Sequence, residues 1–254
     1  MTGGGRDATT VTAADFRALA RSSPWLWRTL QFTLVHDGPV YPGEPIRAYV
    51  GRPHGVRVER LDGRLVQSDW CRAPGAGLPA LDGDPTFRAD GLVARRPGSW
   101  DVPERFDDPM FQTYRWVAML HPFELADGVS SDDEGGWSPL WPPIEVVDGP
   151  REVDHHGRPA WEAQLVTTPA YAARCSCCPL LDGAQAARRL AETDGVIGRP
   201  GDRPIAWLIR LDRGTGVVVA LTEIGGSSHS GGWSMTIEAV DGELPRELFR
   251  PGHG

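Results

Sequence analysis

Five stretches with the residue pattern of β-strands follow one another from Ile144 towards the end of the chain, and this succession constrains the fold more than any other feature. They cover residues 144–153, 159–169, 204–212, 217–224 and 232–240. Each is rich in β-branched and aromatic residues, and short runs of glycine, aspartate or histidine separate several of them. Short strands joined by tight turns predict an antiparallel meander.

The N-terminal half shows the same pattern. We predict strands at 25–35, 46–50, 56–61 and 64–67, with one more near 87–94. The pair Asp62-Gly63 between the third and fourth strands predicts a hairpin, because a type I′ turn needs positive φ at both central residues and Asp-Gly accepts it readily. The N-terminal half is therefore predicted to be a second meander.

Helical patterns interrupt the two meanders. We predict helices over residues 13–21, 109–121 and 183–192. Thr12 and Asp15 resemble a capping box at the start of the first helix, and Pro24 is expected to end it. Asp108 is a typical N-cap for the second, and the third is rich in alanine and arginine. Helices combined with antiparallel strands predict the α+β class.

Length and charge limit the classes of partner. The chain has 254 residues, enough for one substantial core, and we expect a flexible tail at 1–11 and a single domain at 12–254. Its formal charge is −8, and all 26 basic residues are arginines scattered along the sequence. Nucleic acids and acidic membranes attract concentrated positive charge, so both partners are disfavoured. Neither a membrane span nor an export signal is recognisable, which predicts a cytoplasmic protein.

The order of these parts resembles the lipoprotein-carrier superfamily of LolA, LppX and RseB-like proteins. A short amphipathic helix, a strand opened by aromatic residues and an Asp-Gly hairpin precede a helix that ends in His121-Pro122. The closest matches are the phrase Gly-Arg-Pro-Ala-Trp-Glu at 157–162, and Asp212 followed by Thr215-Gly216. The similarity spans roughly residues 12–250.

This resemblance implies a strongly curved antiparallel sheet, an unclosed barrel, with a few helices plugging its concave face. In the superfamily, the resulting cavity receives acyl chains or lipoproteins, or senses them. Members of the superfamily act outside the cytoplasm and carry a signal peptide or a lipid anchor. Since neither is recognisable here, the resemblance implies a cavity for something apolar more than a carrier of exported lipoproteins.

Five of the ten tryptophans fall in predicted strands: Trp25, Trp27, Trp161, Trp207 and Trp233. They are enough to line one face of a curved sheet. One interpretation is an aromatic wall around a bound apolar small molecule or lipid-like ligand. The other is that they fill the core between sheet and helices, since buried aromatic side chains dominate the energetics of cores.

A cysteine cluster at 175–178 is the rarest local feature of the chain. Thiolates are soft ligands that select Cu(I), zinc or iron–sulfur clusters, so one zinc or copper ion is a candidate cofactor. The candidate ligands are Cys175, Cys177, Cys178, Cys71, His155 and His156. Pro179 favours an extended Cys178 and makes convergence of the thiols harder. Reversible oxidation of a thiol pair, or thiols with neither role, are the alternatives.

Catalytic motifs with a defined mechanism are not recognisable. The segment 226–231 superficially resembles Gly-x-Ser-x-Gly, but it joins two predicted strands, and a nucleophile elbow joins a strand to a helix. Asp154 and the adjacent histidines are interpreted first as a polar turn. We therefore predict that the protein is not an enzyme.

Two hypotheses about function follow. The first is a non-catalytic binding protein whose curved sheet holds an apolar ligand or a segment of a protein partner. It requires an apolar cavity or exposed apolar surface. The second is a thiol-based metal-binding or redox-sensing regulator centred on the cysteine cluster. It requires at least three sulfur or imidazole groups to converge.

Overall fold

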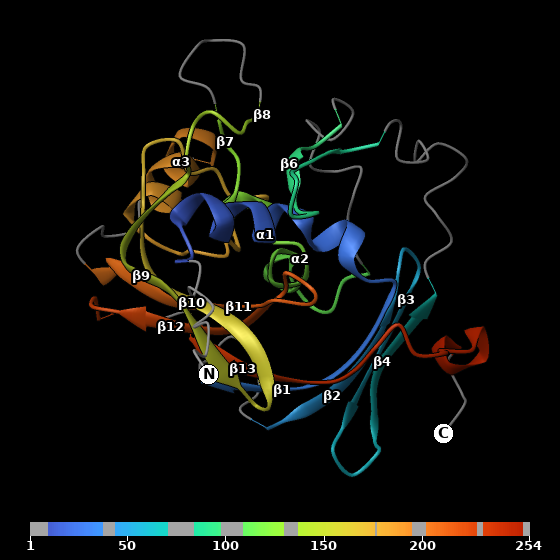
Figure 1. Ribbon diagram of the computed structural model, residues 1–254. Helices are drawn as coiled ribbons and strands as arrows, with labels where there is room; N and C mark the ends of the chain where they lie inside the picture. The colour runs from blue at the N-terminus through green and yellow to red at the C-terminus, as the bar shows by residue number, and fades with distance from the viewer. Residues whose placement is uncertain are drawn as a thin grey trace, which may run out of the picture.

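A large antiparallel sheet wraps around the helices in the computed structural model (Figure 1). The structure describes residues 10–37, 44–70, 84–97, 109–129, 137–175, 177–194, 202–227 and 231–250. Within these ranges the sheet has nine strands, in the order β4-β3-β2-β1-β13-β12-β11-β10-β9. The first meander supplies β1 to β4 and the second supplies β9 to β13, and the two join where β1 pairs with β13.

The strands of this sheet are β1 (Thr29–Asp37), β2 (Ile46–Gly51), β3 (Gly55–Arg60), β4 (Leu65–Trp70), β9 (Ile144–His155), β10 (Arg158–Thr167), β11 (Ala206–Asp212), β12 (Val218–Ile224) and β13 (Gly232–Val240). All neighbouring pairs are antiparallel, and β4 and β9 form the two outer edges. The sheet is therefore an unclosed barrel, as predicted.

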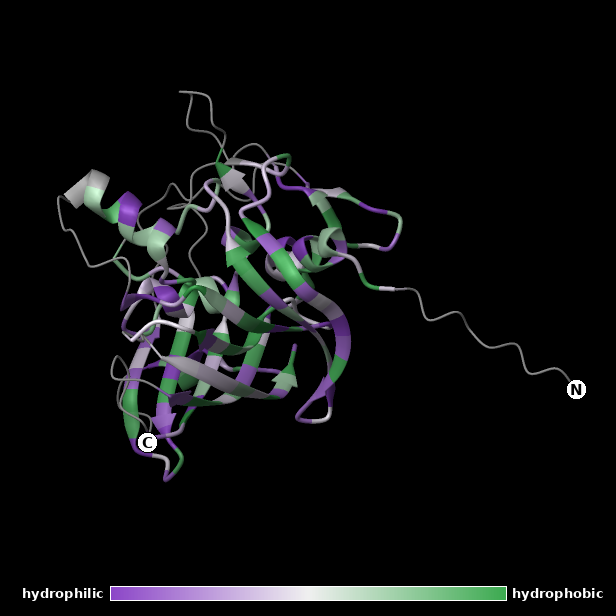
Figure 2. Cartoon of the chain, turned by 90° about the vertical axis from the view of Figure 1, so that its left-hand side faces the viewer, coloured by the Kyte–Doolittle hydropathy of each residue, from purple (hydrophilic) through white to green (hydrophobic). Residues whose placement is uncertain are grey.

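The remaining elements are α1 (Ala13–Leu26), α2 (Tyr114–Leu120), α3 (Ala184–Asp194), the 3-10 helices η3 (Phe123–Leu125) and η5 (Arg246–Phe249), and two small hairpins, β5 (Thr86–Phe87) with β6 (Val93–Arg95) and β7 (Gly128–Val129) with β8 (Trp137–Ser138). Figure 1 shows α1 and α2 inside the curve of the sheet. Hydrophobic and hydrophilic residues alternate along the strands (Figure 2), because successive side chains point to opposite faces. The α+β class is confirmed.

Helix α1 begins where the sequence predicts but ends later. The capping box is present, with the Thr12 hydroxyl accepting from the Asp15 amide and the Asp15 carboxylate accepting from the Thr12 amide. The prediction that Pro24 ends the helix is wrong, because α1 continues to Leu26. A tertiary contact holds this last turn: Ser23 Oγ donates to the Leu120 carbonyl at 2.6 Å, which offsets the backbone hydrogen bond that proline cannot make.

Two turns show how far local patterns determine the hairpins. At the β9–β10 turn, His156 and Gly157 both have positive φ, 52° and 81°, as a type I′ turn requires. At the β3–β4 turn the hairpin is confirmed, but only Gly63 has positive φ, at 88°. The Gly63 amide donates to the Arg60 carbonyl, which makes a three-residue loop in place of the predicted type I′ turn.

Other predicted boundaries shift. The second helix begins at Tyr114 with Thr113 as its N-cap, five residues later than Pro109. The single strand predicted at 87–94 is the hairpin of β5 and β6. Asp108 and residues 1–9 of the predicted tail lie outside the described residues.

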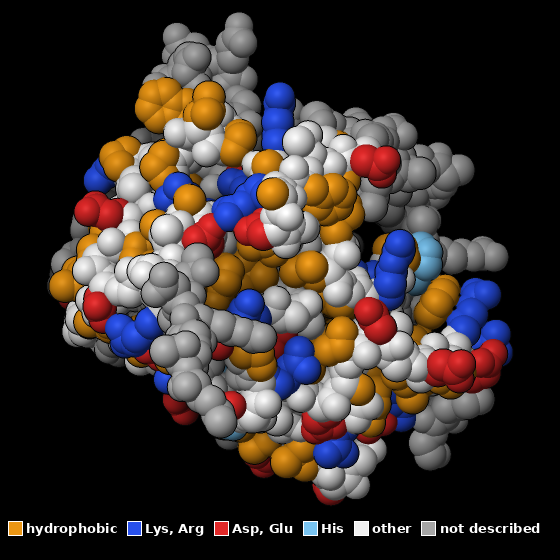
Figure 3. Space-filling model, viewed as in Figure 1, with side chains coloured by type: hydrophobic (Ala, Val, Ile, Leu, Met, Phe, Trp, Pro, Cys, Tyr) orange, Lys and Arg blue, Asp and Glu red, His pale blue; other side chains and the backbone are white. Residues whose placement is uncertain are grey.

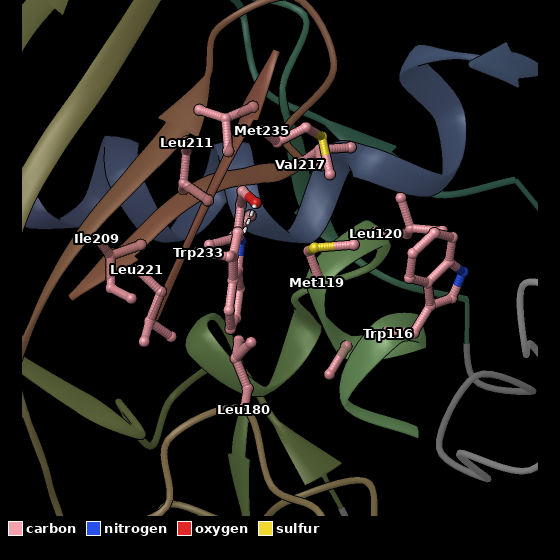
Figure 4. Packing of buried hydrophobic residues seen from close by; sticks show 14 of the residues in the cluster. Trp116, Met119, Leu120, Leu180, Ile209, Leu211, Val217, Leu221, Trp233 and Met235 are labelled. Carbon is pink, nitrogen blue, oxygen red and sulfur yellow. Dashed lines mark hydrogen bonds between the residues drawn. The ribbon is translucent and has the colours of Figure 1, made fainter. Parts of the chain in front are cut away.

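The core lies between the concave face and the helices. Figure 4 shows Trp233 at its centre, standing among Leu221, Met235 and Leu180, with its indole N–H directed at the Val218 carbonyl 3.0 Å away. These side chains are at most 3% exposed. Because apolar area removed from water stabilises at about 25 cal/mol per Å², this interior is the main source of the fold's stability.

Candidate functional site

The concave face carries three of the predicted tryptophans. Register places Trp161 opposite Leu211, Trp207 opposite Leu165 and Trp233 opposite Leu221, so all three indoles point to the core side of the sheet. Trp207 and Trp233 are 1% and 3% exposed, whereas Trp161 is only partly buried. The two buried indoles fill the core beneath the helices.

The strand placement of the other two tryptophans is wrong. Trp25 lies in the last turn of α1, and Trp27 is the C-cap of that helix. The Trp27 indole donates to Ser23 Oγ at 3.2 Å, and the Arg52 guanidinium lies 3.3 Å from its ring centroid. Trp27 therefore packs at the junction between α1 and β1.

An apolar hollow opens at the end of the concave face next to β4. It has a volume of about 20 Å³ and is lined by Leu34, His36, Glu44, Ile46, Arg60, Val66 and Phe111. Val66 is 44% exposed at its rim. The ion pair of Arg60 with Glu44, at 2.5 Å, borders the hollow on its polar side. Such a space accepts one small apolar group, since about 10 to 15 Å³ already holds a water molecule.

His36 stands on the wall of this hollow. Burial and, to a smaller extent, the positive charge of Arg115 together lower the pKa of its imidazole to about 4. His36 is therefore neutral near pH 7. The wall of the hollow at His36 therefore carries no charge near pH 7, and the charged groups of the hollow are those of Glu44 and Arg60.

A second hollow is larger and more polar. It holds about 180 Å³ and is lined by Asp37, Leu221, Thr222, Glu223, Gly231 and Gly232. Glu223 forms a buried ion pair with Arg115 at 3.2 Å. Both hollows are smaller than the roughly 300 Å³ at which small-molecule pockets begin.

The cysteine segment brings three sulfur atoms together. Cys175 Sγ lies 3.0 Å from Cys177 Sγ, and Cys177 Sγ lies 3.7 Å from Cys178 Sγ. All three atoms lie within 4.8 Å of one another, although Pro179 follows directly. Cys177 is exposed and the other two are partly buried, so the group is accessible from solvent.

The three thiols differ in acidity. Burial by itself would raise the pKa of Cys175, but hydrogen bonds from Cys177 and Cys178 to its sulfur prevail and lower it. The hydrogen bond with Cys175 raises the pKa of Cys177, and burial raises that of Cys178. Cys175 is therefore the thiol that ionises first.

A buried carboxylate anchors the loop that carries these thiols. Glu124, on η3, accepts from the Tyr171 hydroxyl and, at 3.4 Å, from the Leu180 amide. The Tyr171 hydroxyl in turn accepts from the Leu181 amide at 3.0 Å. Burial raises the pKa of Glu124, while these donors and Arg174 oppose the shift. The loop from Tyr171 to Leu181 is thus closed at its base by one side chain.

The predicted histidine ligands point elsewhere. His155 Nε2 lies 2.9 Å from the Met235 carbonyl, and its Nδ1 lies 3.2 Å from the Arg210 guanidinium. His156 Nε2 lies 3.0 Å from Ser234 Oγ. Among the described residues, the group of ligand atoms around the thiols consists of the three sulfurs alone. Cys71 lies outside the described residues.

The turn at Asp154 has a structural role. Asp154 Oδ1 accepts from the Gly157 amide at 3.1 Å, which is the polar turn expected there. The segment at 226–231 joins β12 to β13, as predicted, and its residues 228–230 lie outside the described residues. Sequence reasoning missed Glu124, whose role depends on a loop about fifty residues further along the chain. No local pattern marks it.

No protein-family model matches the sequence, and no curated protein does. Among solved structures, the chain is similar to MucB of Pseudomonas aeruginosa in its complex with MucA, at 16% identity and a TM-score of 0.36. That match covers 94% of this chain but 61% of MucB, so the chain spans less than two thirds of MucB.

Two further structures are similar at lower identity. LprF from Mycobacterium bovis matches at 10% identity and a TM-score of 0.36, over 93% of this chain and 97% of LprF. A LolA superfamily protein from Nitrosomonas europaea matches at 8% identity and a TM-score of 0.22, over 96% of this chain and 98% of that protein. At these identities and TM-scores, the similarities carry no ligand or partner over to this chain.

On the face in Figure 3, arginine side chains are interspersed with acidic ones. No helix within the described ranges has the length and apolar character needed to cross a membrane.

Proposed function

We propose that this protein is a non-catalytic binding protein that takes up an extended, apolar segment of a partner protein along β4. The observation that supports this is the combination of an edge strand with an apolar hollow. Among the described residues β4 pairs only with β3, and Val66 on this strand lines the hollow. An added strand would gain affinity from its backbone and specificity from the side chain placed in the hollow.

Exposed apolar side chains surround this edge. Leu65 and Val66 are 38% and 44% exposed, and Met110 next to them is 41% exposed. Gln67 donates to the Met110 carbonyl at 2.9 Å, which fixes that segment beside the strand. Apolar side chains gathered at a strand that is an edge among the described residues favour association with another chain.

The opposite edge is less suitable. The strand β9 contains four acidic residues, Glu145, Asp148, Glu152 and Asp154, and Pro150 interrupts its backbone donors. Charge and proline on an edge strand oppose pairing with a further strand. The six residues of β4 include a single acidic one, Asp69.

The hollow at β4 fits a side chain of a protein segment better than a lipid-like ligand. The hollow at β4 holds about 20 Å³, enough for one small side chain. An acyl chain would need a pocket of several hundred Å³. Trp207 and Trp233, predicted to contact such a ligand, are packed in the core, so in this proposal they support the sheet.

The test is selection of 12-residue peptides from a random library against the full chain, followed by affinity measurements on the synthesised peptides. We expect apolar, extended peptides whose affinity falls at least about tenfold in Val66→Arg, a difference of roughly 1.4 kcal/mol. Amide hydrogen exchange of residues 65–70 should slow when the peptide binds. The matched control is Val147→Arg, which places the same charge at an exposed valine of β9 and should leave binding unchanged.

Three results would overturn the proposal. The first is failure to select any peptide, and the second is slowed exchange at residues other than those of β4. The third is a retained mass of several hundred daltons that is lost on denaturation, because it would identify a carried lipid-like ligand. Urea unfolding of Val66→Arg verifies that this variant is folded.

A further inference from the structure

The cysteine loop forms a site of its own, on another part of the molecule from the edge strand β4. Its three sulfurs come from four consecutive positions and converge within 4.8 Å of one another. Free cysteines are often buried and behave as small apolar side chains, but Cys177 is exposed. Three converging and accessible thiols in a chain with four cysteines need another explanation.

We propose that Cys175, Cys177 and Cys178 together bind one Cu(I) ion as thiolates. The inference goes beyond the binding function proposed for β4 and does not depend on it. Each thiol that becomes a ligand loses its proton to solvent, and the ion keeps its oxidation state. Thiolate sulfur is the soft donor that Cu(I) prefers.

The spacing of the sulfurs fits a three-coordinate ion. Metal–sulfur bonds of about 2.3 Å place three thiolates roughly 4 Å apart around a trigonal centre. The distances from Cys177 to its two partners are 3.0 and 3.7 Å. A shift of about an ångström or less would bring the sulfurs to the trigonal spacing, which rotation of the exposed Cys177 side chain and small adjustments of its partly buried partners can supply.

The number of ligands favours Cu(I) over zinc. A structural zinc ion takes four ligands in a tetrahedron, whereas three thiolates satisfy trigonal Cu(I). In the described part of the chain, His155 is held by Met235 and Arg210, and His156 by Ser234. Neither imidazole joins the three sulfurs.

The ends of the loop from Tyr171 to Leu181 are held in place before any ion binds. Glu124 binds the Tyr171 hydroxyl and the Leu180 amide, one on each side of the cysteines. Arg174, next to Cys175, is fixed by His121 Nδ1 at 2.9 Å and by the ring of Phe123 at 4.6 Å. An anchored loop loses less conformational entropy when its thiols close on an ion.

The experiment uses the reduced, full-length protein without oxygen, with one equivalent of Cu(I) added as its acetonitrile complex. Native mass spectrometry should show one copper per chain. Copper-edge X-ray absorption should show three sulfur neighbours at about 2.3 Å. In competition with a chromogenic Cu(I) chelator, Cys175→Ser and Cys177→Ser should each weaken affinity by more than the roughly 10- to 100-fold typical of an outer-shell change.

Cys71→Ser is the matched control, because it removes one thiol outside the loop and should leave both stoichiometry and affinity unchanged. The proposal is overturned if the chelator keeps all the copper, or if a Cys175→Ser/Cys177→Ser/Cys178→Ser variant binds as the parent does. Equal loss in Cys71→Ser would also overturn it, since the site would then be a different one. Peptide binding at β4 is measured separately, so failure of either proposal is recognised independently.

Discussion

Asp127 Oδ1 accepts a hydrogen bond from Arg21 Nε at 2.7 Å, with both side chains at most 6% exposed. The same carboxylate accepts from Arg96 Nε through its other oxygen, at 2.5 Å. Arg21 also donates to the carbonyls of Val93 and Ala126. One buried carboxylate thus connects α1, the segment after β6 and the chain after η3. We call this group of Asp127, Arg21 and Arg96 the Asp127 clamp.

Asp127→Asn should destabilise the protein by about 3 to 5 kcal/mol, because it leaves two buried guanidinium groups without their counter-charge. Urea unfolding measures this. Asp148→Asn is the control, since Asp148 pairs with Arg151 at the surface and its loss should leave the unfolding midpoint unchanged. Equal urea midpoints for the two variants would contradict the claim that the Asp127 clamp stabilises the fold.

Stability should fall below pH 6.5 through His36. Burial, reinforced by Arg115, places the pKa of this imidazole at about 4 in the folded protein, below the ordinary 6.5. The unfolded chain therefore binds the proton more readily. The contribution of the neutral His36 imidazole to the free energy of unfolding is complete above pH 6.5. It is lost as the pH falls through 4, which lowers the free energy of unfolding by about 1 to 3 kcal/mol.

The measurement is the free energy of unfolding at several pH values for the parent and for His36→Gln. The variant should lose less stability between pH 6.5 and 4 than the parent. His156→Gln, at the exposed β9–β10 turn, should keep the parent's pH dependence. If His36→Gln shows the same pH dependence of stability as the parent, the neutral buried imidazole is not the source of that dependence.

Gly216→Ala should destabilise more than Gly63→Ala. Both glycines have positive φ, 67° and 88°, which is unfavourable for alanine by roughly 1 kcal/mol or more. A Cβ at Gly216 would also lie 2.6 Å from the Leu19 carbonyl oxygen of α1, whereas a Cβ at Gly63 meets open space. The clash should add about 1 to 3 kcal/mol, seen as a larger drop in the urea midpoint. Equal drops would show that the turn and α1 are further apart.

Trp207→Ala should destabilise by about 3 to 5 kcal/mol, since it removes a side chain that is 1% exposed. Trp161→Ala should destabilise less, because its indole is only partly buried. Urea unfolding of both variants measures the difference. A larger effect at Trp161 would mean that the indoles at the edge of the concave face, more than those beneath the helices, support the sheet.

Local patterns predicted much of the fold. Strands β2, β9 and β11 to β13 lie within a few residues of their predicted positions, because β-branched residues and turn residues act over short distances. The His156-Gly157 turn needs only its own backbone angles. The resemblance to the LolA/RseB-like superfamily, drawn from the order of these parts, predicted the open curve of the sheet and the helices inside it.

Two features of the structure could not be predicted from local patterns. The end of α1 depends on Ser23 reaching Leu120, which outweighs the tendency of Pro24 to stop a helix. The hollow at β4 depends on β1, β2, β3 and β4 curving towards the segment before α2. Val66 lines the hollow only because the sheet curves in this way.

The sequence by itself determined most of the strands, the places of the β3–β4 and β9–β10 hairpins and the presence of three cysteines in one short segment. The tertiary structure decided that the tryptophans beneath α1 and α2 are core, that the thiols converge and that Glu124 anchors their loop. The physical reason is range: turn angles and strand propensity act between neighbours along the chain. The Asp127 clamp joins residues 106 positions apart, and only the closed fold brings such partners within hydrogen-bonding distance.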